Sequence, residues 1–436
     1  MTAALGKSII ASLAFVIATA EARVIVLKPG VTVVSTEYIV REGDTLRGAS
    51  GGSTLRASST FKGRAIVVLE SRTTIEGLSI DGNRAKLGKP MPIAPYDRAF
   101  ADFYPNNGIL SVGTEKLVVR NVTLRNIANF AVLISGVRGV SVTGVKVYDS
   151  GSLSDKGRNN TTGGILFEEG TFEFSAINCV VENVSGNGIW THSRMTSPRN
   201  ETGSFENNTF RNIGRDALQV GHATEVGVIR NSGSLIGYPH KVVDVEGGGM
   251  PVAIDTAGNV ENSWYEQNRF EEINGKCIDL DGFHDGIVQE NTCINRGPAT
   301  AYPSGHFGIV FNNTNPHMES VGIRVIDNVI DGTKFGGIFV IGRNHTIRGN
   351  RLLRLNLAGC NESHQKFGCI YNAEEPEILQ TGIYLGRKAE RPDPARENTI
   401  TGNVISGFRM KERCVATAPG VEQKTNTIEA NDCRNQ

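Results

Sequence analysis

The chain has 436 residues, and its 45 Lys and Arg balance 45 Asp and Glu, so the formal net charge is zero. This balance argues against a nucleic-acid partner, which normally requires a basic patch, and against steering of a strongly charged ligand. The 51 Gly and only 15 Pro suit many short strands joined by tight turns.

The first 20 residues predict an export signal. Lys7 precedes an apolar stretch from Ile9 to Ala18, and Ala18-Thr19-Ala20 offers small residues for cleavage. The alternative is a buried N-terminal helix or strand. The stretch is short for a membrane span, and no other segment approaches that length. We predict a signal peptide at 1–20, one domain at 21–436, no membrane span, and a secreted or periplasmic location.

A short apolar unit recurs along the rest of the chain. Its clear copies are Gly108-Ile109-Leu110, Gly164-Ile165-Leu166, Gly188-Ile189-Trp190, Cys277-Ile278-Asp279, Gly308-Ile309-Val310, Gly337-Ile338-Phe339 and Gly382-Ile383-Tyr384. Weaker copies are Ala131-Val132-Leu133, Ala217-Leu218-Gln219 and Pro251-Val252-Ala253. A second unit, Asn followed by alternating apolar residues, begins at Asn121, Asn178, Asn208, Asn268, Asn291, Asn328, Asn350 and Asn403.

The distance between the two units is nearly constant. In three coils the Asn of the second unit precedes the central apolar residue of the first unit by 10 residues, namely from Asn208 to Leu218, from Asn268 to Ile278 and from Asn328 to Ile338. Short strands of period two separated by bends predict coils that bury their apolar faces only by stacking. Asn suits such bends, and identical amides can form a ladder between coils. The sequence therefore predicts an all-β, parallel β-helix solenoid of one domain, and neither a sandwich nor a propeller explains the offset.

Six of the seven cysteines fall into local pairs. The pairs are Cys277 with Cys293, Cys360 with Cys369, and Cys414 with Cys433. Export permits disulfides, although spacing alone does not prove connectivity and all could be core thiols. Cys179 would remain as a buried thiol. The cysteine and histidine spacing suggests no zinc site.

The chain resembles the pectate-lyase-like superfamily of right-handed parallel β-helices over about residues 24–430. Besides the repeats, the resemblance rests on an opening in which Arg47-Gly48 and Leu55-Arg56-Ala57-Ser58 lead to the segment Thr74–Gly82. It implies the right-handed fold and a carbohydrate ligand. The superfamily contains hydrolases, lyases, epimerases and phage tailspikes, so the resemblance does not specify an activity.

Ionisable residues concentrate on the outward positions of the central coils. If the Ile of each unit points inward, the next residue and the one two further along point outward. Asp279 and Asp281 then lie about 6.6 Å apart along one strand, and we expect Asp255 to stack about 4.8 Å from Asp281. Carboxylates this close should titrate at different pH values, which provides the acid and the base of glycoside hydrolysis. Solvated carboxylates and a calcium site remain alternatives.

Further residues are expected to line the same face. His284 is a candidate catalytic residue beside the aspartates, and Asp285, which follows it, is a candidate substrate-binding residue. Trp190 offers an aromatic platform for a sugar ring, although packing under a loop would also explain it. The remaining substrate-binding candidates are Glu168, His192, Gln219, His222, Asn312 and Tyr384. Two segments without strand periodicity, 83–107 and 222–250, are expected to wall the groove.

Three functions fit these residues. A glycoside hydrolase would use Asp255, Asp279 and Asp281, resembling polygalacturonase-like hydrolases but without their Asn-Thr-Asp, Gly-His-Gly and Arg-Ile-Lys motifs. The second function is that of a uronate lyase or C5-epimerase with calcium. It is suggested by the segment Asp281-Gly282-Phe283-His284-Asp285, the end of which resembles the Asp-Pro-His-Asp motif of alginate epimerases. Its candidate bases are Arg194 and Lys366. A non-catalytic glycan-binding protein is the third. The preferred prediction is the hydrolase, with a polysaccharide or oligosaccharide partner and no metal or other cofactor.

Overall fold

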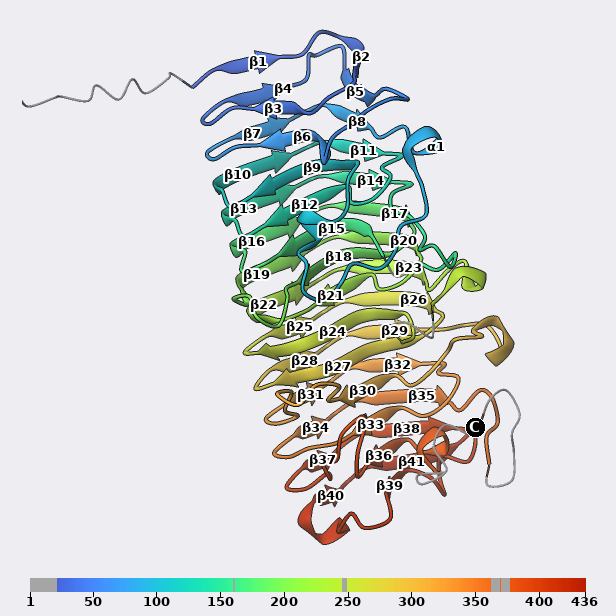
Figure 1. Ribbon diagram of the computed structural model, residues 1–436. Helices are drawn as coiled ribbons and strands as arrows, with labels where there is room; N and C mark the ends of the chain where they lie inside the picture. The colour runs from blue at the N-terminus through green and yellow to red at the C-terminus, as the bar shows by residue number, and fades with distance from the viewer. Residues whose placement is uncertain (1–21, 160, 245–248, 362–368, 370–376) are drawn as a thin grey trace, which may run out of the picture.

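The computed structural model describes residues 22–159, 161–244, 249–361, 369 and 377–436. The predicted signal peptide and Lys366 lie outside these residues. The chain winds in successive coils along one axis, so that its two ends lie at opposite ends of an elongated stack (Figure 1). Each strand pairs in parallel with the strand three places later in the chain. These pairings create three faces, named here face 1, face 2 and face 3. The predicted parallel β-helix is confirmed.

The strands of each face follow the chain order. Face 1 contains β3 (Tyr38–Val40), β6 (Ala65–Leu69), β9 (Asn107–Val112), β12 (Val132–Ser135), β15 (Gly163–Glu168), β18 (Asn187–His192), β21 (Leu218–Val220), β24 (Val252–Glu261), β27 (Lys276–His284), β30 (Ile309–Asn312), β33 (Ile338–Val340), β36 (Ile383–Leu385) and β39 (Val415–Thr417). Face 2 contains β1 (Val24–Val26), β4 (Thr45–Arg47), β7 (Thr74–Glu76), β10 (Glu115–Arg120), β13 (Arg138–Thr143), β16 (Phe172–Ile177), β19 (Asn200–Glu206), β22 (Ala223–Ile229), β25 (Trp264–Glu266), β28 (Ile287–Gln289), β31 (Arg324–Ile326), β34 (Thr346–Arg348), β37 (Thr399–Thr401) and β40 (Thr427–Glu429). Face 3 contains β2 (Gly30–Val34), β5 (Ser53–Ala57), β8 (Ser79–Asp81), β11 (Thr123–Arg125), β14 (Lys146–Tyr148), β17 (Val180–Val184), β20 (Thr209–Ile213), β23 (Ser232–Ile236), β26 (Arg269–Ile273), β29 (Thr292–Ile294), β32 (Val329–Asp331), β35 (Arg351–Leu355), β38 (Val404–Gly407) and β41 (Asp432–Asn435).

Helical turns lie in the connections between these strands. They are α1 (Arg84–Leu87) and the 3-10 turns η1 (Phe100–Asp102), η2 (His240–Val242), η3 (Ala299–Ala301), η5 (Ile378–Gln380) and η6 (Gln423–Thr425). Within the described residues, no helix is long and apolar enough to cross a membrane.

The inward residues of face 1 form one continuous column. The column runs through Ile109, Val132, Ile165, Ile189, Leu218, Ile254, Ile278, Ile309, Ile338 and Ile383. Each of them is essentially inaccessible to solvent. Burying one such side chain stabilises a fold by about 1.5–3 kcal/mol, so the repeated aliphatic position aligns the coils.

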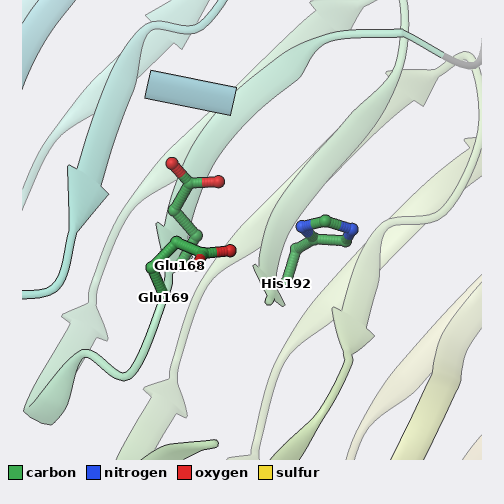
Figure 2. A group of neighbouring side chains, drawn as sticks. All are labelled: Glu168, Glu169 and His192. Atoms are coloured by element: carbon green, nitrogen blue, oxygen red, sulfur yellow. The ribbon is translucent and has the colours of Figure 1, made fainter. Parts of the chain in front are cut away.

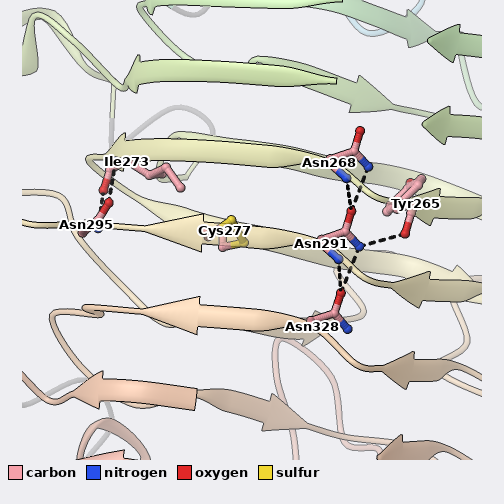
Figure 3. The surroundings of a disulfide bond; sticks show 8 residues. Tyr265, Asn268, Ile273, Cys277, Asn291, Asn295 and Asn328 are labelled. Atoms are coloured by element: carbon pink, nitrogen blue, oxygen red, sulfur yellow. Dashed lines mark hydrogen bonds between the residues drawn. A yellow bond between two sulfur atoms is a disulfide. The ribbon is translucent and has the colours of Figure 1, made fainter. Parts of the chain in front are cut away.

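A ladder of buried asparagines runs between faces 2 and 3. It joins Asn208, Asn231, Asn268, Asn291, Asn328, Asn350, Asn403 and Asn431 by amide hydrogen bonds of 2.8–3.0 Å between successive coils. Figure 3 shows the part of the ladder around Asn291. The predicted Asn ladder is confirmed, whereas Asn121 and Asn178 are exposed bend residues with φ values of 52° and 55°.

Three disulfides have the pairings suggested by spacing. They are Cys277–Cys293, Cys360–Cys369 and Cys414–Cys433, and Cys179 is a buried free thiol. Cys277 begins the central coil on β27, and Cys293 is on β29 of face 3 in the same coil (Figure 3). This bond fixes the start of the strand that carries two of the predicted catalytic aspartates.

Candidate active site

The outward residues of face 1 form a second column beside the aliphatic one. In chain order it contains Leu110, Leu133, Leu166, Trp190, Gln219, Asp255, Asp279, Val310, Phe339 and Tyr384. Polar and acidic members therefore occur only in its centre, as the sequence predicted. The apolar members at either end are buried beneath the connections between coils.

The expected stacking of Asp255 on Asp281 is wrong. Ile254 pairs with Ile278 and Ala257 pairs with Asp281, which aligns Asp255 with Asp279. The repeat pattern predicts Val252 as the inward residue of its coil, whereas Ile254, two positions later, occupies that column. Asp255 and Asp279 are therefore the neighbours across the strands, and Asp281 lies along β27.

A pocket of about 390 Å³ opens over β21, β24, β27 and β30. It brings together four aspartates, Asp216, Asp255, Asp279 and Asp281, with the cations Arg215 and Lys276. Gln219, Asn312, Thr314, His306 and Glu390 complete its polar lining. The pocket therefore collects the three predicted catalytic aspartates and two of the predicted binding residues, Gln219 and Asn312.

Burial of this acidic group perturbs its titration. Burial, together with the charges of Asp216 and Asp279, raises the pKa of Asp255 well above its usual range. Burial likewise raises the pKa of Asp216 to about 6 and the pKa of Asp281 to about 6. Desolvation disfavours the charged carboxylate, and neighbouring negative charges add to that effect. Near neutral pH the pocket therefore contains protonated and ionised carboxyl groups together.

Each aspartate has a distinct set of partners. Asp279 Oδ2 lies 2.5 Å from Lys276 Nζ, while its Oδ1 is buried and has no hydrogen-bond partner in the described part of the chain. Gln219 Nε2 donates to Asp255 at 2.7 Å, and the Thr314 N–H donates to Asp281 at 2.8 Å. One oxygen of Asp279 is thus held by an ammonium group, and the other is buried without a partner among the described residues.

Asp216, Lys276 and Arg215 were not predicted. Asp216 and Lys276 each stand two residues before the inward residue of their coil, at the position that Asn187 occupies in β18. The predicted site residues all lie after the inward residue of their coil, so this position was outside the pattern. Aligning all coils on their inward residue and reading the position two before it would have found both charged side chains.

His284 and Asp285 do not line the pocket. Strands β24 and β27 bend from face 1 to face 2 at Gly258 and Gly282, whose φ values of 105° and 75° favour glycine. His284 Nε2 lies 2.9 Å from Asn259 Oδ1, and its Nδ1 lies 3.1 Å from Asp285 Oδ2. Because the bend carries His284 around the corner, we do not assign it a part in the chemistry of the pocket.

Glu168 is a clamp for a covering segment. It is 0% exposed, and its two oxygens accept the N–H groups of Phe100 and Ala101, both at 2.9 Å. Burial raises the pKa of Glu168 to about 7. Because its carboxylate is already occupied and sealed from solvent, Glu168 cannot contact a substrate as expected.

Glu168, Glu169 and His192 form a group that could hold a metal ion (Figure 2). Within the described residues, no other group of three or more His, Cys, Asp and Glu side chains brings its ligand atoms within 4.8 Å of one another. The Arg194 guanidinium, however, already binds the Glu169 carboxylate at 2.8 Å. The ion pair favours a structural role for this group over the binding of a metal ion. The carboxylate oxygens of the pocket aspartates do not lie as close to one another as the ligand atoms of this group.

The remaining predicted residues are sheltered. Trp190 is 7% exposed, and His192 stacks on Phe100 with ring centroids 4.4 Å apart. His222 Nε2 lies 3.1 Å from the Ser197 carbonyl oxygen, and burial lowers the pKa of this imidazole. Tyr384 is 1% exposed and is not an open platform.

The two expected wall segments differ from each other. Residues 83–107 contain α1 and η1, and the part from Met91 to Tyr104 covers face 1, as expected from its lack of strand periodicity. The second expectation is wrong for about the first half of its length, because β22 and β23 lie between residues 223 and 236. Only the part after β23 is a connection. Its Gly249 and Met250 line the pocket, and Gly247 and Gly248 are outside the described residues.

Comparisons with known proteins agree on the fold. The family described as "Right handed beta helix region" matches residues 163–352. No curated protein sequence matches the chain. The surface adhesin PfbA of Streptococcus pneumoniae is a structural neighbour with 12% identity and a TM-score of 0.52, covering 75% of this chain and 83% of the adhesin.

Two further neighbours have names that indicate enzymes. The GH136 lacto-N-biosidase of Eubacterium ramulus has 15% identity and a TM-score of 0.51, covering 90% of this chain, which spans 62% of that enzyme. The DFA-IIIase of Arthrobacter chlorophenolicus A6, solved in complex with GF2, has 12% identity and a TM-score of 0.50, covering 93% and 87% of the two chains. At these identities the likeness concerns the fold alone, and together with the family match it supports a right-handed parallel β-helix.

Proposed function

We propose that the protein is a carbohydrate-active enzyme that hydrolyses glycosidic bonds. The observation that carries this proposal is the group of four aspartates in one pocket, in which buried carboxyls of raised pKa adjoin the Lys276–Asp279 ion pair. Glycoside hydrolysis requires one carboxylic acid that protonates the leaving oxygen and one carboxylate that acts as nucleophile or base. The names of the two enzyme neighbours support the same class of substrate.

Within this proposal, Asp281 is the general acid and Asp279 is the carboxylate. Asp281 is partly accessible and has a pKa near 6, which suits a proton donor operating slightly below neutral pH. Asp279 has one oxygen held by Lys276 and a second oxygen without a partner among the described residues. Asp255 would remain protonated and orient the sugar, together with Gln219.

A uronate lyase or C5-epimerase is the second candidate, and Arg215 and Lys276 favour it. Cations on the pocket wall would neutralise the carboxylate of a uronic acid, which such enzymes require before they remove the neighbouring proton. Lys276 is already paired with Asp279, which makes hydrolysis the stronger proposal. A glycan-binding protein without catalysis is the remaining reading.

We also propose that the protein acts outside the cytoplasm. Three disulfides support this location, because disulfides persist in oxidising compartments and are rare in reducing ones.

The proposed function can be tested on a panel of neutral and uronic-acid polysaccharides. New reducing ends and the ultraviolet absorbance of unsaturated uronates would be followed together, with and without a calcium chelator. Hydrolysis predicts reducing ends without absorbance, no effect of the chelator, and loss of activity in Asp281→Asn. The control is Asp327→Asn, which changes an exposed aspartate at the bend between β31 of face 2 and β32 of face 3, away from the pocket on face 1. Absorbance that the chelator abolishes would support the lyase, and binding without either signal would support the glycan-binding protein or an epimerase.

A further inference from the structure

The proposed active site is closed at its N-terminal side by a covering segment, residues 91–104, named here the strap. Its residues Ala94, Ala101 and Tyr104 are buried in an apolar cluster against Leu110, Leu133, Leu166 and Trp190 of face 1. The Tyr104 hydroxyl accepts the Ala94 N–H at 3.0 Å, and Glu168 accepts two strap N–H groups. The strap is therefore a fixed part of the fold that covers the outward column up to Trp190.

A small cavity lies where the strap ends. Its volume is about 140 Å³, and three rings, Phe100, Trp190 and His192, contribute to its lining. Asn159, Thr161, Thr162, Asn187 and Thr191 supply polar groups. An apolar protein cavity of about 150 Å³ accommodates benzene, so this space fits one six-membered ring. Aromatic faces with hydroxyl and amide groups around them suit a sugar, which presents C–H bonds on its face and hydroxyls at its edge.

This aromatic cavity is continuous with the aspartate pocket. Arg215, Gln219 and Ala257 line both. The buried Trp190 Nε1 and His192 Nδ1 have no hydrogen-bond partner in the described part of the chain. Buried polar atoms are normally satisfied, and these two ring nitrogens are unpaired although both are closed off from solvent. A sugar ring in the cavity would adjoin the sugar that lies over the aspartates.

The opposite side of the aspartate pocket is also limited. Val310, Phe339 and Tyr384 continue the outward column but are nearly inaccessible. Asn313 Nδ2 donates to the Arg391 carbonyl oxygen at 3.2 Å and its Oδ1 accepts the Arg391 N–H at 2.9 Å, and the neighbouring Glu390 reaches the pocket lining. The accessible part of face 1 is therefore a short pocket and does not continue as a groove along the stack.

We propose that the cavity formed by Phe100, Trp190 and His192 binds the terminal sugar of the substrate, so that the enzyme acts at chain ends or on short oligosaccharides. This inference rests on the proposed function. A chain whose ends are blocked, or the interior of a long polymer, has no path past the strap. Apolar contact with the Phe100 ring, which itself stacks on His192, then contributes to the affinity for the terminal ring.

The product pattern tests the inference. Wild-type enzyme should release one small product size from the first time points, while the mean length of the remaining polymer hardly changes, and a substrate with blocked ends should resist cleavage. A broad ladder of products and a rapid fall in mean length would overturn the inference and leave hydrolysis standing. If no carbohydrate on the panel is cleaved, the proposed function fails and the inference fails with it.

A variant of the strap supplies the second test. Phe100→Ala should raise KM for a short oligosaccharide about 2- to 10-fold, since an aromatic contact is worth about 0.5–1.5 kcal/mol. Phe103→Ala is the matched control, because Phe103 is on the same strap but is not part of the cavity lining. Phe100→Leu, which keeps apolar bulk without a ring, and the unfolding temperature of each variant separate loss of stacking from loss of folding. An unchanged KM in folded Phe100→Ala would overturn the inference.

Discussion

The buried carboxyl of Glu168 makes a prediction about stability and pH. Its pKa of about 7 exceeds the usual 4.5, so the folded protein retains a proton that the unfolded chain has already released. The unfolded state then binds fewer protons, and stability falls as pH rises. The contribution is complete below about pH 4.5 and is lost as pH rises through about 7. The difference between the two pKa values corresponds to about 3 kcal/mol.

Glu168→Gln should remove this dependence. The amide oxygen can accept only one of the N–H groups of Phe100 and Ala101 in good geometry and leaves the other beside an NH₂ group, at a cost of about 1–3 kcal/mol. At pH 5 the variant should therefore be less stable than the wild type. By pH 8 the wild type bears the cost of a buried charge and the variant does not, so the difference should shift by about 3 kcal/mol in favour of the variant.

Urea unfolding at several pH values between 5 and 8 measures this shift. The free energies of unfolding of wild type, Glu168→Gln and Glu201→Gln would be compared, the last being an exposed glutamate on β19. Glu201→Gln should follow the wild-type curve. Parallel curves for wild type and Glu168→Gln would refute the argument that burial controls this carboxyl group.

Three further predictions follow from the pocket and the ladder. If Asp281 is the general acid, kcat should fall as pH rises through about 6, because the acid must be protonated; a pH–rate profile without that limb would reject the assignment. Lys276→Met should lower the free energy of unfolding by about 3 kcal/mol or more and abolish activity, because it leaves Asp279 buried without its cation. The double variant with Asp279→Leu should regain stability but not activity, which unfolding and rate measurements together can check. Asn291→Ala should lower the free energy of unfolding by about 4 kcal/mol, since it removes four side-chain hydrogen bonds; Gln289→Ala on the neighbouring strand is the control, and equal urea midpoints for the two variants would contradict this role of the ladder.

The fold could be predicted because its signal is local and repeated. Residues equivalent to Ile278 and Asn268 occur in coil after coil, so the side chains of each coil align the next coil on it. The exception is informative. The Gly237–Pro251 connection and the bend at Gly258 alter the spacing around β24, and the inward residue there is Ile254 and not the expected Val252. The register is decided by the neighbouring coil, which the local pattern does not contain.

The site was predicted only in part because its other residues meet through space. Asp279 and Asp281 were found because both alternate outward on one strand. Glu168 is 67 residues from Ala101, whose N–H it accepts, and no spacing rule connects a strand carboxylate with a 3-10 turn. The sequence therefore presented Glu168 and Trp190 as solvent-facing residues, although the strap covers both.

The Cys277–Cys293 disulfide turns the coil that bears Asp279 and Asp281 into a covalent ring. In a stacked repeat protein each coil contacts only its neighbours, so thermal opening begins at an end and advances one coil at a time. Cross-linking this coil lowers the conformational entropy of its unfolded state, so the coil resists a front of unfolding that advances from the N-terminal end. Partial heating of the oxidised protein should leave the chemistry intact after the N-terminal coils have opened, whereas reduction should make loss of activity coincide with loss of those coils.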